Sequence, residues 1–472
     1  MHPDENHGHD RAFSLWQELR DSIKGTDADY TKISLKRAIL LLAVPMVLEL
    51  VMESTFAVVD IFFVSSLGPS AVATVGLTET YLFLLYSVAM GLSMAVTAIV
   101  ARRIGEKSEE GAGLVTVQSV VLGALVSVPF SAAGLFFAKD LLGLMGADAW
   151  AMEHGYRYTQ WMLGGNVVIV LLFVINAVFR GAGDAAIAMR VLWISNAVNM
   201  ALVSVLVTGK GPFPALGVEG AAIATNIGRG IGVLAQLYYL FKGSPKLHLL
   251  ASRLRLDAGI LLEVFKTALG GIGQMFVGMT SWIFLMRILS NVGSEAVAGA
   301  TIALRIMMFT LMPAWGLSNA AATLVGQNLG AKNPDRAESS VWKIGIYNTY
   351  FLGVVSLVYF FFNESLMGIF TADPEVIAIG SSWLRILSYS FLVYGWWMVS
   401  TQAFNGSGDT RTPTYINLVF FWMIQIPLSY FLALRLGWQH TGVFWGVFFS
   451  ETSAGLFTLW LFSRGGWKQT KV

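Results

Sequence analysis

The sequence predicts an all-α integral membrane protein with twelve transmembrane helices, arranged as two six-helix lobes related by a parallel internal repeat. Three observations lead to this prediction: the composition, the apolar runs, and motifs that recur at one spacing. Of the 472 residues, 55% are hydrophobic and 13% are charged, whereas soluble globular chains carry roughly 25% charged residues. A chain with so little polar surface is expected to place its excess apolar surface against lipid.

Apolar runs of about 20 residues, the length that crosses a bilayer, occur twelve times. Because twelve is even, both termini are expected on one side of the membrane. Lys and Arg concentrate in the loops of that side, so the positive-inside rule predicts cytoplasmic termini in a multi-pass protein of the inner (cytoplasmic) membrane. The predicted spans are 36–65, 71–101, 113–138, 158–180, 187–208, 217–242, 259–290, 296–326, 341–363, 382–404, 413–435 and 441–463.

Motifs of the first half recur in the second half at one constant offset in residue number. Gly105 recurs as Gly330, and the pair Gly217-Val218 recurs at the same offset as Gly442-Val443. Six helices per half give both halves the same orientation, an arrangement typical of transporters that rock one lobe against the other. The predicted parts are a cytoplasmic leader (1–35), an N-terminal lobe (36–242), a cytoplasmic linker (243–258), a C-terminal lobe (259–463) and a cytoplasmic tail (464–472).

Several classes of function are disfavoured by what the sequence lacks. It has no Cys, which excludes disulfides and thiolate chemistry. A net charge of +2 does not suggest nucleic-acid binding. The glycine-rich turns at 180–184 and 406–409 do not continue into a Walker A motif, which weighs against ATP as the energy source. No constellation of catalytic residues indicates an enzyme, and no cofactor is expected.

The first predicted span contains three carboxylates, which are costly inside a membrane and usually face a bundle interior or an aqueous cavity. With Glu49 at zero, Glu53 lies at about 40° and Asp60 at about 20° around the helix, so the three share one stripe. Like charges this close cannot all stay ionised without a counter-charge. Such a stripe can hold a proton or a small cation and release it, which is what coupled transport requires.

The repeat supplies an internal comparison for these acids. The equivalent positions of the second half hold Gln274, Gly278 and Leu285. The acids therefore do not belong to the shared scaffold, and the N-terminal lobe is expected to carry the coupling. The alternative, that each acid pairs with a basic side chain or reaches an interface, stays open.

The chain resembles the MATE (multidrug and toxic compound extrusion) family over nearly everything after residue 35. The resemblance rests on motifs that each half contributes in order: Gly91-Leu92-Ser93, Ala101-Arg102-Arg103-Ile104-Gly105, Arg180-Gly181-Ala182-Gly183-Asp184, Gly217-Val218-Glu219-Gly220, Val325-Gly326-Gln327-Asn328-Leu329-Gly330 and Gly406-Ser407-Gly408-Asp409. It implies a secondary antiporter that exports organic cations, drugs or metabolites in exchange for protons or sodium ions. The alternative within the same superfamily is a flippase for lipid-linked saccharides.

The resemblance also implies a cation site in the first lobe. Asp60, Asn199 and Thr225 match three of its residues. If the site binds sodium, the ion is expected at Asp60. The fourth position falls on Val203, which cannot bind a cation. Fewer oxygen ligands hold a hard cation less well, so protons are slightly favoured over sodium, although Glu53 could compensate.

Four further polar residues within the spans are possible substrate or cleft residues: Asn176, Asn196, Gln274 and Arg305. The alternative for each is an interhelical hydrogen bond or a structural anchor. Five further charged residues are interpreted as lying close enough to helix ends to be solvated or locally paired: Arg229, Glu263, Arg287, Arg385 and Glu451. The expected partners are a small organic, cationic substrate and membrane lipid, and the protein is expected to work as a monomer.

Overall fold

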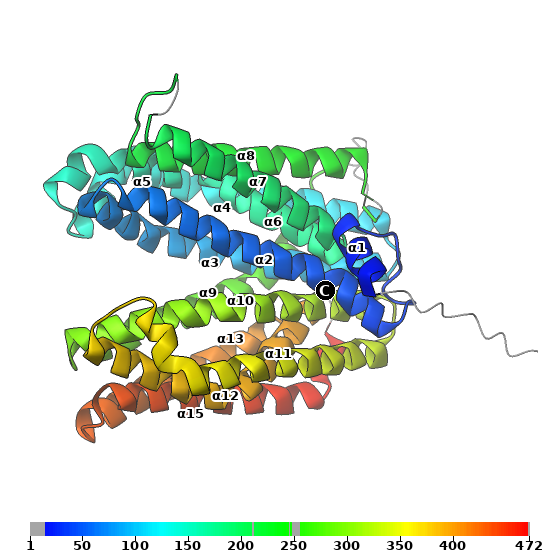
Figure 1. The fold of residues 1–472 in the computed structure, drawn as a ribbon. Helices are drawn as coiled ribbons and strands as arrows, with labels where there is room; N and C mark the ends of the chain where they lie inside the picture. The colour runs from blue at the N-terminus through cyan, green and yellow to red at the C-terminus, as the bar shows by residue number, and fades with distance from the viewer. Residues whose placement is uncertain (1–14, 210–211, 245, 248–254, 471–472) are drawn as a thin grey trace, which may run out of the picture.

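The computed structural model describes residues 15–209, 212–244, 246–247 and 255–470, and within them the secondary structure is entirely helical (Figure 1). Long, roughly antiparallel helices form two sets that draw together at the end where the termini lie. The first-half set contains α2 (Leu35–Ser65), α3 (Pro69–Gly105), α4 (Glu109–Leu144), η1 (Ala151–Gly155), α5 (Tyr156–Gly164), α6 (Asn166–Ala182), α7 (Ala185–Leu206) and α8 (Val218–Lys242). The second-half set contains α9 (Ala258–Ser290), α10 (Ser294–Gly330), α11 (Pro334–Gly368), α12 (Pro374–Ser407), α13 (Arg411–Asn417), η3 (Leu418–Gln425), α14 (Ile426–Tyr430), η4 (Phe431–Arg435) and α15 (Gln439–Ser463).

Ten helical segments of the described chain are long and apolar enough to cross a membrane. They coincide with ten of the twelve predicted spans, and most extend several residues beyond them. The remaining two predicted spans are the helices α8 and α15, each of 25 residues, which are not among the ten. Both carry an ionisable residue within the apolar run, Arg229 in α8 and Glu451 in α15.

Two of the predicted spans are irregular. The span predicted at 158–180 is divided at Gly165 into α5 and α6 and is preceded by the π-helical turn η1. The span predicted at 413–435 alternates between α-helical and π-helical segments around Pro427. Proline lacks an N–H and its ring crowds the preceding turn, and the wider π-helical turns are found next to such local interruptions.

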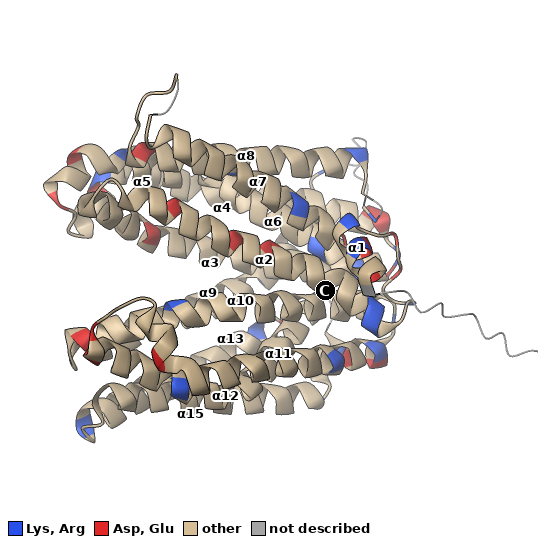
Figure 2. Ribbon diagram, in the orientation of Figure 1, with Lys and Arg blue, Asp and Glu red and all other residues tan. Residues whose placement is uncertain are grey.

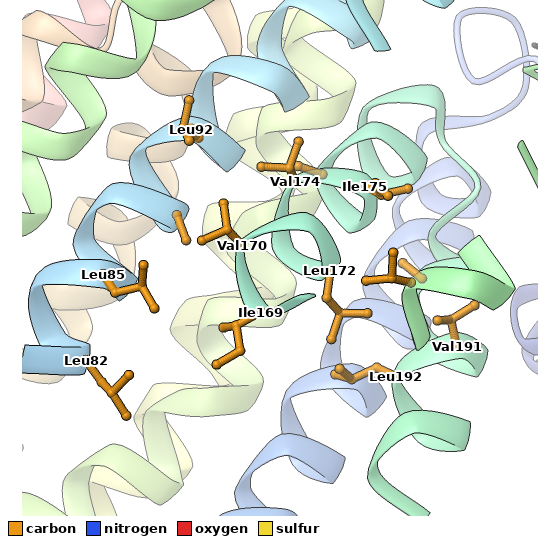
Figure 3. Packing of buried hydrophobic residues seen from close by; sticks show 14 of the residues in the cluster. Leu82, Leu85, Leu92, Ile169, Val170, Leu172, Val174, Ile175, Val191 and Leu192 are labelled. Carbon is orange, nitrogen blue, oxygen red and sulfur yellow. The ribbon is translucent and has the colours of Figure 1, made fainter. Parts of the chain in front are cut away.

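Each set has an apolar core, and a third buried cluster is shared between the two sets. One buried cluster joins α3, α6, α7 and α8 of the first half with the start of α9, and Val170 and Leu172 of α6 lie between Leu85 of α3 and Val191 of α7 (Figure 3). A second cluster joins α9 to α15 of the second half around Trp383 and Phe444. The third cluster packs α2 of the first half against α10, α11 and α12 of the second, so the two halves also bury apolar surface against each other.

Contacts between the halves repeat with the same offset as the sequence motifs. A Cβ atom on Gly91 would collide with Ile272, and one on Gly316 would collide with the backbone of Val47. These are equivalent contacts, because Ile272 is the repeat counterpart of Val47 and Gly316 is the repeat counterpart of Gly91. The halves thus meet through reciprocal surfaces in which glycine permits close approach of the helix backbones.

The leader is packed against both halves rather than detached from them. It forms a helix, α1 (Leu15–Lys24), and then a turn in which Tyr30 is buried. The Tyr30 hydroxyl donates a hydrogen bond to the Gly183 carbonyl at 3.0 Å, and Arg336 of the second half donates one to the Tyr30 carbonyl at 3.0 Å. The first fourteen residues and much of the linker (245 and 248–254) lie outside the described residues.

The two ends of the molecule differ in charge. Lys and Arg gather at the end where the termini lie and are sparse at the opposite end (Figure 2). At the termini end the tail also joins the halves, because Arg102 donates a hydrogen bond to the Thr470 carbonyl at 2.9 Å and Lys468 pairs with Glu338 of α11.

Candidate functional site

Glu49 points from α2 into the first-half set and is paired there. The side chain is only 4% exposed, and its Oε1 accepts hydrogen bonds from Asn176 Nδ2 at 3.2 Å and Arg180 Nη1 at 3.3 Å. Gln236 of α8 extends the network by donating to Asn176 Oδ1 at 2.6 Å. Arg180 lies in the last turn of α6, at the start of the glycine-rich motif 180–184, and it supplies the counter-charge for Glu49.

Glu53 lies one turn further along α2 and has a different arginine. Arg229 Nη1 donates to Glu53 Oε2 at 3.3 Å, and Asn196 Nδ2 donates to the same oxygen at 3.2 Å. The guanidinium of Arg229 also lies 5.1 Å from the centre of the Phe56 ring.

The interpretation of Arg229 as a residue near a helix end is wrong. It lies in the middle of α8 and is only 4% exposed, so it must find a charged partner inside the protein. Glu451 is likewise central in α15 and buried, and Arg385 lies well inside α12. Only α12 is much longer than its predicted span (382–404), whereas the ends of α8 and α15 lie within two residues of the predicted ends, so Arg229 and Glu451 were misjudged although the helix ends were nearly right.

Asp60, the third acid of α2, forms an ion pair with neither Arg180 nor Arg229. Its Oδ1 is buried and has no hydrogen-bond partner among the described residues. The charges that act on it are those of Glu79 in α3 and, with opposite sign, Arg229. The pattern of one unpaired carboxyl beside a second acid distinguishes Asp60 from Glu49 and Glu53.

Glu79 was missed by the sequence reasoning. It lies in the interior of α3, and its charge acts on Asp60 and is in turn acted on by Arg305 of α10. The available signal was its position inside the apolar run 71–101, which is the same signal that identified Asp60. Arg305 is exposed and forms no ion pair with any other described residue, and its charge acts on Glu79 of the first half.

Asn199 and Thr225, two residues of the expected cation site, are in contact. Asn199 Nδ2 donates to Thr225 Oγ1 at 3.0 Å, both side chains are buried, and Asn199 Oδ1 is left without a partner in the described part of the chain. Val203 is fully buried one turn beyond Asn199. No hydrogen bond between the described residues joins Asp60 to either Asn199 or Thr225.

Gln274, the second-half counterpart of Glu49, is buried in α9. Asn417 Nδ2 donates to its backbone carbonyl at 3.4 Å, and its side-chain Oε1 has no partner among the described residues. The second half therefore repeats the position of Glu49 but not its charge, and this lobe of the site carries an amide where the first half carries an ion pair.

This arrangement suits a site that binds and releases a proton or a cation. Two acids of α2 are held by fixed arginines, while the third has a free buried oxygen next to another carboxyl. A proton or a monovalent cation at Asp60 would relieve the repulsion between Asp60 and Glu79. Among the described residues no group of three or more His, Cys, Asp and Glu side chains is placed to hold a metal ion.

Comparison with known proteins identifies relatives over almost the whole chain. The family model described as MatE matches residues 45–205 and 267–431. The probable multidrug resistance protein YoeA of Bacillus subtilis is 25% identical over 447 residues, covering 94% of this chain and 96% of the relative. The probable multidrug resistance protein NorM of Thermotoga maritima is 26% identical and covers 93% and 94% of the two chains. An FAD transporter of Shewanella oneidensis is 25% identical over 83% of this chain and 87% of its own length.

Solved structures share the fold. A multidrug resistance MATE family transporter in an outward-facing conformation superposes with a TM-score of 0.86 at 24% identity, covering 96% of this chain and 99% of the other. A MOP superfamily transporter from Pyrococcus furiosus, described as having a binding pocket of reverse polarity, gives a TM-score of 0.85 at 23% identity with the same coverage.

Proposed function

Because the chain belongs to the MATE family of membrane transporters, we propose that it is a secondary active antiporter that exports small organic cations across the inner membrane in exchange for protons. It is a transporter and not an enzyme. The observation that carries the proposal is the buried Oδ1 of Asp60, which has no hydrogen-bond partner among the described residues and is acted on by the charge of Glu79. An acid in this setting can bind a proton on one side of the membrane and lose it on the other.

The choice of protons over sodium follows from the ligands around Asp60. Sodium prefers several oxygen ligands. Val203 provides none, and Glu53, which could have compensated for it, is held by Arg229 and Asn196. A guanidinium acting on Asp60 also disfavours a second cation there. These features support proton coupling.

We further propose that the chain crosses the membrane twelve times, with α8 and α15 as spans beside the ten apolar segments, in two six-helix lobes with both termini in the cytoplasm. The excess of Lys and Arg at the termini end supports this orientation (Figure 2). The contacts between the lobes lie toward that end, so the arrangement corresponds to a molecule closed on the cytoplasmic side.

The cargo is proposed from charge. Four acidic side chains of α2 and α3 stand in the first lobe against two arginines, and such a surplus attracts cations. One relative is described as an FAD transporter, so the anionic flavin FAD is the substrate to compare with an organic cation.

The test is transport by purified protein in proteoliposomes, with the pH gradient and the sodium gradient imposed separately. A fluorescent organic cation should move against a pH gradient without sodium, and Asp60→Asn should abolish the movement. Glu110→Gln, at an exposed position, is the control and should transport normally. Transport that requires sodium would refute proton coupling, and transport of FAD but not of the cation would refute the proposed cargo.

A further inference from the structure

A crevice of about 620 Å³ lies between α9 and the irregular α14–η4 segment, at the end of the bundle remote from the termini. Both helices reach their C-terminal ends there. The crevice is lined from α9 by residues spaced three and four apart, which form one helix face. The opposite wall comes from the segment around Pro427, where the α-helical turn passes into a π-helical one.

The floor of the crevice is apolar. Phe284 and Ile288 come from α9, and Ile426 and Phe431 come from the other wall. An apolar slot of this kind on a membrane protein is complementary to a hydrocarbon chain, because each methylene removed from water contributes roughly 0.8 kcal/mol. A free inorganic anion would gain nothing from these side chains.

The rim of the crevice carries two arginines. Arg287 lies in the last turn of α9 and Arg435 in the last turn of η4, and both are exposed. Neither forms an ion pair with any other residue in the described part of the chain. Tyr430 and Asn291 lie at the same rim and can add neutral hydrogen bonds.

Two other cations at this end of the described chain have partners. Arg157 is paired with Glu219 at 3.4 Å, and Lys139 lies 4.3 Å from the centre of the Tyr156 ring. A basic residue near a helix C-terminus is also stabilised by the helix dipole, which accounts for one arginine in each helix. It does not account for the two converging on one cavity without an acid.

We propose that this crevice binds one anionic phospholipid, with the phosphate held between Arg287 and Arg435 and an acyl chain against the apolar floor. Guanidinium groups bind phosphate oxygens through paired, charge-assisted hydrogen bonds. Arginine side chains near a span end also reach to the headgroup level of a bilayer. The bound lipid would join α9 to the proline-interrupted segment at its outer end. This inference requires membrane insertion but not antiport, so it stands or falls separately from the proposed function.

The test is native mass spectrometry of the full chain in detergent, titrated with phosphatidylglycerol or phosphatidylcholine. One phosphatidylglycerol should bind more tightly than phosphatidylcholine. Arg287→Gln and Arg435→Gln should each weaken its binding about fivefold, the effect of one basic residue on an anionic lipid surface. The double substitution should remove the preference. Arg464→Gln, which removes a positive charge at the opposite end, is the matched control and should bind as the unaltered protein does.

A second variant separates the lipid from its phosphate. Ile426→Trp fills the apolar floor while leaving both arginines in place, and it should reduce phosphatidylglycerol binding without changing the melting temperature measured in phosphatidylcholine. Equal binding of the two lipids, full binding by the double arginine variant, or complete competition by inorganic phosphate would each overturn the proposal.

Discussion

Gly105 and Gly330 lie against each other where the two halves meet, and each is the counterpart of the other in the internal repeat. A Cβ on Gly330 would come within 3.0 Å of the Gly105 Cα and would collide with the Arg102 carbonyl oxygen. A Cβ on Gly105 would collide with the Gln327 carbonyl oxygen, and Gln327 is the repeat counterpart of Arg102. The contact is therefore reciprocal and depends on the absence of side chains on both helices.

The first prediction concerns this contact. Gly105→Ala and Gly330→Ala should each disfavour the closed arrangement at the termini end, because added atoms in a tight contact cost about 1–3 kcal/mol. The chain has no Cys, so spin labels can be attached to cysteines introduced at Glu110 and Lys332. The distance distribution between the labels should shift to longer values. Gly353→Ala, where the added Cβ makes an ordinary contact, should leave it unchanged.

The second prediction concerns the ion pair between Glu53 and Arg229. Arg229→Gln should lower the melting temperature, because it leaves Glu53 without its counter-charge. Glu53 is 31% exposed, so the loss should fall between the roughly 1 kcal/mol of exposed pairs and the roughly 3–5 kcal/mol of buried ones. Glu53→Gln combined with Arg229→Gln should recover part of it. Additive effects in this double-mutant cycle would contradict a direct pair.

The third prediction concerns Asp29 in the leader. Burial acts to raise its pKa, but hydrogen bonds from Lys107 and Thr31 outweigh burial and lower the pKa from 3.8 to about 2. Because the folded-state pKa is depressed, the stabilisation is complete above about pH 4 and is lost as the pH falls toward 2. A fluorophore on a cysteine introduced at Asp27 should change its signal only in that range. Asp29→Asn should give the low-pH signal at neutral pH, while Glu18→Gln should not.

The fourth prediction tests the missing ligand at Val203. Val203→Asp places a carboxylate one helical turn from Asn199, whose Oδ1 is unpartnered in the described part of the chain, and should make transport dependent on sodium. Calorimetric titration with sodium chloride should then detect binding that the unaltered protein lacks. Val203→Asn, which is similar in size but neutral, is the control. Sodium binding by the unaltered protein would contradict the proposal that Val203 leaves the site without a ligand that sodium needs.

The fifth prediction concerns Glu79, whose charge interacts with those of Asp60 and Arg305. Glu79→Gln should raise the KM for a cationic substrate several-fold while changing kcat less, because a negative charge facing the second half is lost. Arg305→Gln should act in the opposite direction on KM, since it removes the positive charge that acts on Glu79. Equal KM values in both variants and in the unaltered protein would show that the pair does not face the substrate path.

Local patterns in the sequence were enough to predict the long helices and their positions, because the length of an apolar run is a local property that the bilayer thickness selects. The repeat offset likewise predicted which glycines are equivalent, and the structure adds that Gly105 and Gly330 are in contact with each other. For the breaks at Gly165 and around Pro427, the sequence showed only a glycine and a proline, which permit a break in a helix but do not require one.

The partners of the charged side chains were decided by the tertiary structure. The sequence alone predicted that Glu49, Glu53 and Asp60 share a stripe of one helix, which follows from helical periodicity. It could not predict that Arg180 would pair with Glu49 and Arg229 with Glu53. Nor could it predict that Asp60 would be left without an ion pair and would interact with Glu79. Those relationships join residues from different helices, and their distances depend on how the helices pack rather than on any spacing along the chain.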